Sequence, residues 1–273
     1  MADASTLEHA GCRLAWKVTG AGDPVVMIQG VGVHGDGWRP QVEALRHRWS
    51  CLTFDNRGAG ASQPLGVPRL TVDQMADDVR ALMDAQGWSS AHVVGHSLGG
   101  LVALVLALRA RPRVRSLALL CTFARGRDAG RSARMIWVGT RSRVGTRRMR
   151  RHAFLEIVMP PDLLAGADRD QLAADLAPLF GHDLADHPAI EMRQLSAMRG
   201  CDVLAELPAL ADLPTLVVSA EHDPIAPPPL GEAMARAVPG ARFVLLRQAS
   251  HGVPIHGADA VNTLLATHLD RVP

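Results

Sequence analysis

The sequence predicts an α/β protein with a mostly parallel, doubly wound sheet and an inserted helical lid. Three observations predict this fold class. Short apolar runs rich in β-branched residues recur along the chain, stretches with helical periodicity separate them, and the alternation stops between residues 123 and 207. Continuous apolar runs suit strands that are buried on both faces, as in a parallel sheet covered by helices.

The apolar runs predict strands, and we place these over residues 12–18, 24–29, 50–55, 91–97, 116–123, 215–220 and 242–248. The clearest helix signal lies at residues 71–87, where Thr71 is an N-cap residue, Gln74 completes a capping box and Gly87 ends the helix. Further helices are expected over residues 40–49, 98–110, 230–238 and 260–269. The chain is thus expected to divide into a core of residues 1–122 and 208–273 and a helical lid of residues 123–207.

The charges of the predicted lid are segregated along the chain. Residues 125–151 hold ten arginines and one acid, Asp128, whereas residues 152–191 hold eight acids and one arginine, Arg169. We expect the two halves to pair with each other and with water. The alternatives are an arginine-lined entrance that attracts an anionic substrate, or a contact with nucleic acid or membrane.

Composition narrows the class of protein further. The chain has 273 residues, 48% of them apolar and 21% charged, with a net charge of +2, so nothing favours nucleic acid or membrane as a partner. A signal peptide and a membrane span are not evident, and we expect a cytoplasmic protein, with homodimerisation left open. The cysteines are isolated, which fits free thiols and no metal site: Cys12, Cys51, Cys121 and Cys201.

Ser97 stands in a G-x-S-x-G motif, Gly95 to Gly99, between a predicted strand and a predicted helix. In this context the serine occupies a strained turn that exposes its hydroxyl, and the glycines let the helix approach the strand. The N-terminus of the helix favours negative charge on a nucleophile or an oxyanion. The motif therefore predicts Ser97 as a nucleophile, the alternative being a serine that only caps the helix.

A serine nucleophile needs a base within hydrogen-bonding reach and an acid that orients this base. His251 follows the last predicted strand and is our candidate base. Asp223 follows another strand and is our candidate acid, with Glu221 as its main rival, and the order serine, acid, histidine is expected for this motif. Weaker candidates for the base are His34, His222, His256 and His96, whose side chain we expect to leave the turn in another direction.

Four motifs occur in one order along the chain: FDNRGAGAS at 54–62, GHSLGG at 95–100, AEHDPIAP at 220–227 and SHG at 250–252. With them the sequence resembles α/β-hydrolase-fold proteins over nearly its whole length. The first motif resembles the D-x-R-G-x-G-x-S turn of that family, and the last two stand at the family's acid and histidine positions. Among family members, the chain looks most like small bacterial esterases, enol-lactonases and perhydrolase-like enzymes.

The resemblance implies an oxyanion hole formed by the backbone N–H groups of Val31 and Leu98. Family members usually open the first of these loops with His-Gly, whereas this chain has Gln29-Gly30. Backbone donors do not depend on side-chain identity, so we expect the hole to remain. What the usual histidine contributes is left open, with His34 either a substitute or a surface histidine.

Residues 30–35, GVGVHG, also match the dinucleotide-binding fingerprint G-x-G-x-x-G, and Asp55 could serve as its acidic residue. The fingerprint requires a helix to begin on the loop, so that the helix N-terminus meets the pyrophosphate. Pro40 instead suits the first position of a later helix. We expect Asp55 to brace its own turn and Arg57. No cofactor is therefore expected.

These observations predict a serine hydrolase for a small carboxylic ester or lactone. Ser97 would attack the carbonyl carbon while His251 takes its proton and Asp223 holds the imidazole. The amides of Val31 and Leu98 would stabilise the oxyanion, and water would release the acyl-enzyme. The alternatives on the same fold are a C–C bond-cleaving or non-hydrolytic enzyme and a ligand-binding signalling protein that retains the triad.

Overall fold

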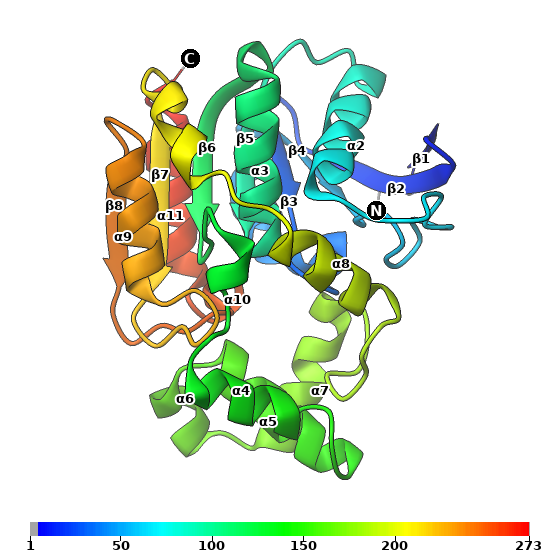
Figure 1. The fold of residues 1–273 in the computed structure, drawn as a ribbon, viewed down its shortest axis with the longest axis vertical. Coiled ribbons are helices and arrows are strands. Elements are labelled where there is room, and N and C mark those ends of the chain that lie inside the picture. Colours follow the sequence, from blue (N-terminus) through cyan, green and yellow to red (C-terminus); the bar gives the residue numbers. More distant parts are fainter. Residues whose placement is uncertain (1–4, 273) are drawn as a thin grey trace.

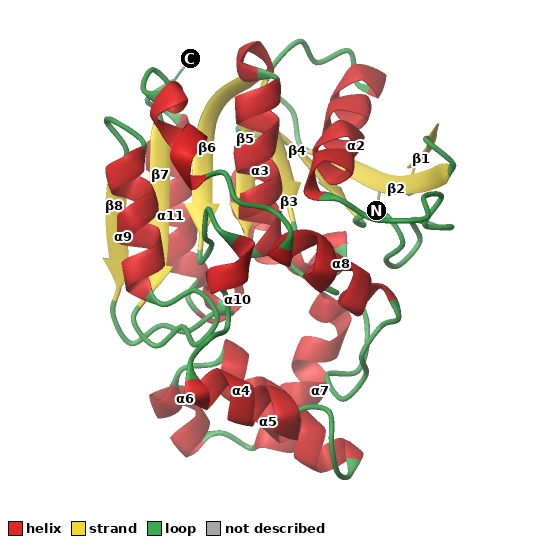
Figure 2. Ribbon diagram, in the orientation of Figure 1, coloured by secondary structure: helices red, strands yellow, loops and turns green. Residues whose placement is uncertain are grey.

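The computed structural model describes residues 5–272, which form an eight-stranded sheet with helices on both faces (Figures 1 and 2). The strand order is β1-β2-β4-β3-β5-β6-β7-β8. The strands are β1 (Ser5–His9), β2 (Cys12–Thr19), β3 (Asp23–Ile28), β4 (Trp49–Phe54), β5 (Ala91–His96), β6 (Val114–Leu120), β7 (Thr215–Ala220) and β8 (Arg242–Leu246). β2 pairs antiparallel with β1 and β4, and all pairs from β4 to β8 are parallel.

Each strand expected from the sequence has a counterpart among β2 to β8, and the predicted fold class is confirmed. β1 was not expected. Its residues are mostly exposed, so it lacks the apolar run that marks the other strands, and it pairs with β2 through a tight turn. Ala10 and Gly11 both have positive φ in this turn, which is typical of a two-residue hairpin.

The helices are α1 (Arg39–Leu45), α2 (Val72–Ala85), α3 (Leu98–Arg109), α4 (Ala133–Arg141), α5 (Arg147–Val158), α6 (Pro161–Gly166), α7 (Arg169–Phe180), α8 (Ile190–Arg199), α9 (Pro228–Ala237), α10 (Val253–His256) and α11 (Ala258–Leu269). One apolar core joins the sheet to α2, α3 and α9, and a second joins its other face to α1 and α11. The sheet is therefore buried on both faces, as its continuous apolar strands require.

Helices α4 to α8 lie between β6 and β7 in the chain, within the predicted lid, and we use "lid" below for residues 123–207. Figure 1 shows α4 to α7 gathered beyond the carboxyl ends of the parallel strands, with α8 leading back towards the sheet. An apolar cluster of their own joins α4, α5, α6 and α7. The boundaries of the lid at residues 123 and 207 stay a prediction.

The arginines of the first half of the lid pair with the acids of the second half. The ion pairs are Arg141–Glu156, Arg143–Glu191, Arg147–Asp186, Arg148–Asp170 and Arg151–Asp183. The expected pairing of the two halves is thus confirmed, and most of these arginines are occupied by neighbours in the lid. No helix in the described part of the chain has both the length and the apolar character of a membrane span.

Candidate active site

Ser97 occupies the turn between β5 and α3 with φ 54° and ψ −122°, a conformation that strains a residue with a side chain. Neighbouring residues hold the turn in place. Ser97 N donates a hydrogen bond to the Leu120 carbonyl at 3.0 Å, and the Thr122 hydroxyl donates to the Ser97 carbonyl at 2.6 Å. Hydrogen bonds with the end of β6 and with Thr122 therefore hold Ser97 in the strained turn that the motif predicts.

The glycines around Ser97 allow α3 to start in close contact with two strands. A Cβ atom on Gly95 would lie 2.3 Å from the Gly99 carbonyl oxygen, and one on Gly99 would lie 2.0 Å from the Ile28 carbonyl oxygen. Both distances are far below van der Waals contact, so side chains at these positions are excluded. The close approach brings the first turn of α3 against the loop that follows β3.

His251 and Asp223 meet beyond the ends of β8 and β7. The Nδ1 atom of His251 donates to Asp223 Oδ2 at 2.8 Å, and both side chains are buried. The other carboxylate oxygen accepts the backbone N–H groups of Ile225 and Ala226 at 2.8 and 2.9 Å. Burial alone would raise the pKa of Asp223, but the charge and hydrogen bond of His251, with these two amides, bring it below its ordinary value. Asp223 is therefore poised as a carboxylate that orients the imidazole.

The rival acid lies elsewhere, and so do most of the other candidate bases. Glu221 accepts hydrogen bonds from Arg247 and from the Gln248 amide, on the exposed side of the loop. His256 contacts the backbone of Ser250, and His34 contacts the lid at Gly181. The described contacts thus favour Asp223 and His251 over these alternatives.

His96 lies closer to His251 than the sequence suggested. Its Nε2–H donates to the backbone carbonyl of His251 at 2.9 Å, and the two rings are 4.8 Å apart. Burial is the main reason that the pKa of His96 falls to about 3, with a further lowering by His251. His96 is therefore a neutral donor that supports the backbone of His251, and it lines the same cavity as Ser97.

The loop after β3 packs against Ser97. Gly30 is packed so closely that a Cβ atom on it would lie 3.1 Å from Ser97 Cβ. Among the described residues, neither Val31 N nor Leu98 N has a hydrogen-bond acceptor. Unbonded N–H groups at these positions are available to a developing oxyanion, as an oxyanion hole requires.

Gln194 of α8 anchors this loop from the lid. Its Oε1 atom accepts the Gly32 N–H at 2.8 Å, and Gly32 has φ 74°, where glycine is favoured. The Gln194 side chain is fully buried. Gln194 was not among the residues predicted for the site, although the sequence holds a signal: it lies four residues after Ile190 and four before Met198, on the buried face of the helix.

Gln29, which stands where the family usually has histidine, is buried beside the same loop. Its Oε1 atom accepts the Gly30 N–H at 3.3 Å, and its backbone carbonyl accepts Asn56 Nδ2 at 3.0 Å. His34 does not take the place of the missing histidine, because its ring packs under Gly181 at the end of α7. Gln29 therefore holds the loop through its side-chain oxygen and its backbone carbonyl.

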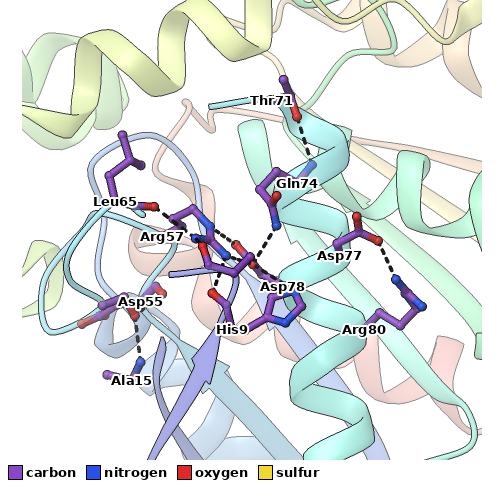
Figure 3. A network of polar contacts seen from close by, with 12 residues as sticks. His9, Ala15, Asp55, Arg57, Leu65, Thr71, Gln74, Asp77, Asp78 and Arg80 are labelled. Carbon is purple, nitrogen blue, oxygen red and sulfur yellow. Dashed lines mark hydrogen bonds and ion pairs between the residues drawn. The ribbon is translucent and has the colours of Figure 1, made fainter. Parts of the chain in front are cut away.

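The 54–62 turn braces the loop from the other side. The Asp55 carboxylate accepts the Ala61 N–H within its own turn at 2.9 Å and the Gly35 N–H at 2.8 Å. The expected contact of Asp55 with Arg57 was wrong: Arg57 pairs with Asp78 of α2, as Figure 3 shows. The sequence could not reveal this partner, because it depends on how α2 packs on the turn.

The hydrogen bond between Gly35 and Asp55 argues against dinucleotide binding. Gly35 begins a single 3-10 turn that ends at Trp38, and α1 starts only at Arg39. The Gly35 N–H, which a bound phosphate would need, is already donated to Asp55. The loop therefore lacks the helix N-terminus that the fingerprint requires.

A cavity of about 400 Å³ lies between the sheet and the lid. Ser97, His251 and Val31 line it on the side of the sheet, and most of its lid wall is apolar, with contributions from Met135, Phe154, Ile157, Phe180 and Leu195. Cavities of this size hold small molecules. The predicted nucleophile and base thus line one cavity.

Residues 23–258 match the family described as alpha/beta hydrolase fold. The chain belongs to this family. It is 29% identical over 259 residues to RutD, a candidate carbamate hydrolase of Azorhizobium caulinodans, covering 94% of this chain and 95% of the relative. The enol-lactonase of Burkholderia xenovorans LB400 is 28% identical with a TM-score of 0.79, covering 97% of this chain and 100% of its own. A thermophilic esterase of Thermogutta terrifontis is 26% identical with a TM-score of 0.81, covering 99% of both chains.

The recognised family is therefore confirmed, and the protein is an enzyme of the α/β-hydrolase type. Its relatives carry the names of different hydrolases, so the family alone leaves the bond that is cleaved undecided.

Proposed function

We propose that this α/β-hydrolase cleaves a small carboxylic ester or lactone through Ser97, His251 and Asp223. The Nδ1–H of His251 is directed to Asp223, which leaves Nε2 free to take the proton of Ser97 as its oxygen attacks the carbonyl carbon. The N–H groups of Val31 and Leu98 stabilise the oxyanion, and water then releases the acyl group from Ser97.

One observation carries this proposal. A serine in a strained strand-to-helix turn and a histidine oriented by a buried carboxylate line the same cavity, beside two amides without acceptors. Ser97 Oγ makes no hydrogen bond to His251 in this structure, and contacts of this kind often form only with substrate bound. The names of the Burkholderia and Thermogutta proteins, an enol-lactonase and an esterase, agree with this reaction class.

A fluorophosphonate probe tests the activated serine directly. The intact protein should gain the mass of one phosphonyl group, Ser97→Ala should not be labelled, and Ser196→Ala, which changes an exposed serine of α8, should be labelled like the wild type. Equal labelling of Ser97→Ala would overturn the proposal.

Turnover of 4-nitrophenyl acetate, butyrate and octanoate, with a panel of small lactones, then tests the reaction class. We expect multiple turnovers, and Ser97→Ala should lower kcat by about 10⁴-fold or more. A single burst without turnover on every ester and lactone would indicate a ligand-binding protein that retains the triad, and would refute the proposed hydrolase.

A further inference from the structure

The lid wall of the cavity carries a cluster of polar side chains that the proposed reaction does not use. Arg143 Nη2 donates to Glu191 Oε1, and the second carboxylate oxygen lies 2.7 Å from His187 Nδ1. His187 Nε2 in turn donates to the backbone carbonyl of Ser142 at 2.8 Å. All four residues line the cavity that Ser97 lines. Because Ser142 and Arg143 are adjacent, these contacts close a ring that fixes the position of the Arg143 guanidinium.

The charges along this wall do not cancel. Among the described residues that line the cavity, the formally charged side chains are Arg143, Arg199 and Glu191. Their sum is +1 in a cavity whose walls are otherwise mostly apolar. Arg199 has no acidic partner among residues 5–272, and Arg143 Nε and Nη1 have no acceptor there.

Arg143 differs from the other arginines of the basic segment of the lid, residues 125–151, because it lines the cavity. Arg141, Arg147, Arg148 and Arg151 pair with lid acids and do not line the cavity. The sequence raised the possibility of an entrance lined by many arginines. Of the basic segment only Arg143 lines the cavity in the described part of the chain, and Arg199 joins it from the end of α8. A guanidinium with free N–H groups matches the planar geometry of a carboxylate.

We propose that the substrate carries a carboxylate, separate from the bond that is cleaved, that Arg143 binds it, and that Arg199 adds positive charge to the same cavity. This inference rests on the proposed function, since it concerns the same cavity. Glu191 holds Arg143 in position but opposes the bound anion by its own charge. Arg143 and Arg199 thus act as specificity-determining residues, whereas the cleavage itself belongs to Ser97 and His251.

Matched esters test the proposal. The experiment measures kcat/KM for two anionic substrates, the mono-4-nitrophenyl esters of adipic and suberic acids. It compares these values with kcat/KM for 4-nitrophenyl hexanoate and octanoate, which have the same chain lengths without the carboxylate. The wild type should prefer the anionic esters. Arg143→Gln should reduce this preference about five- to tenfold, mainly through KM, and Arg199→Gln should reduce it in the same direction.

Two further variants separate binding from damage to the lid. Glu191→Gln should increase the preference for anionic esters, because a negative charge leaves the site, whereas a disordered lid would lower it. Arg148→Gln is the matched control, since Arg148 is exposed, pairs with Asp170 and does not line the cavity. It should leave the preference unchanged.

The proposal is overturned if the wild type prefers the neutral esters of equal length, or if Arg143→Gln lowers both classes equally. These results leave the proposed function intact, because neutral esters would still be turned over through Ser97. If no ester of either class is turned over and the fluorophosphonate probe does not react, the proposed function itself fails.

Discussion

Replacement of Asp78 by asparagine is expected to destabilise the protein by about 3 kcal/mol. The side chains of Arg57 and Asp78 are 0% and 1% exposed, and Arg57 Nε donates to Asp78 Oδ2 at 2.9 Å. Burial opposes the charge on Arg57, but the bonds and the charge of Asp78 raise its pKa above the ordinary value. Asparagine would leave this guanidinium charged, buried and facing an amide N–H₂.

The remaining bonds of Arg57 place the expected loss at the lower end of the range for a broken buried pair. Its guanidinium also donates to the carbonyls of His9, Ala10 and Leu65 at 3.0–3.1 Å, and these bonds survive the substitution. They compensate for part of the lost ion pair, so we expect about 3 kcal/mol from a typical range of about 3–5 kcal/mol.

Urea unfolding followed by circular dichroism measures this loss. With a slope of about 3 kcal/mol per molar urea, the midpoint should fall by about 1 M. Asp77→Asn is the matched control on the same helix, because Asp77 forms an exposed pair with Arg80, worth about 0.5 kcal/mol or less (Figure 3). Equal midpoints for the two variants would refute the reasoning that burial, and not charge pairing alone, sets the cost.

Further predictions concern pH, packing and the loop of Val31. Burial, followed by the charge of Arg115, lowers the pKa of His92 to about 4 in the folded protein. Between pH 6.5 and 4 the unfolded chain therefore binds a proton at this histidine that the folded protein does not bind, and stability falls with pH. Thermal unfolding midpoints should therefore fall as pH drops from 6.5 to 4, less steeply in His92→Gln, and an unchanged slope would contradict this assignment. Gly99→Ala should prevent accumulation of folded protein, since its Cβ would meet a β3 carbonyl oxygen at 2.0 Å; a folded variant with normal turnover would disprove this. Gln194→Met, which removes the acceptor of the Gly32 amide, should lower kcat about tenfold with little change in KM. The exposed change Gln171→Met should alter neither constant, and equal kinetics for the two variants would argue against anchoring by Gln194.

Periodicity in the sequence predicted the sheet and its covering helices because burial on both faces leaves a continuous apolar run in each strand. β1 was not predicted, because an exposed edge strand needs no continuous apolar run. Ser97, Asp223 and His251 were predictable as candidates because each lies within five residues of the carboxyl end of a strand, and these ends of parallel strands meet at one edge of the sheet.

The partners that hold these residues were less predictable. Arg57 was expected beside Asp55 and instead pairs with Asp78, 21 residues away. Gln194 contacts Gly32 across 162 residues of chain, and Arg143 contacts Glu191 across 48. Such pairs depend on how one helix is rotated against a loop or another helix, and a pattern within either segment does not contain that information.

The hydrogen bond between Gly32 and Gln194 has a consequence for protein engineering. A lid grafted from a relative would replace the wall that faces the substrate and, at the same time, remove the acceptor that shapes the loop of Val31. Substrate range and turnover would then change together, unless the new helix also brings an acceptor within reach of Gly32. Lid exchange in this enzyme therefore calls for a graft designed around that amide.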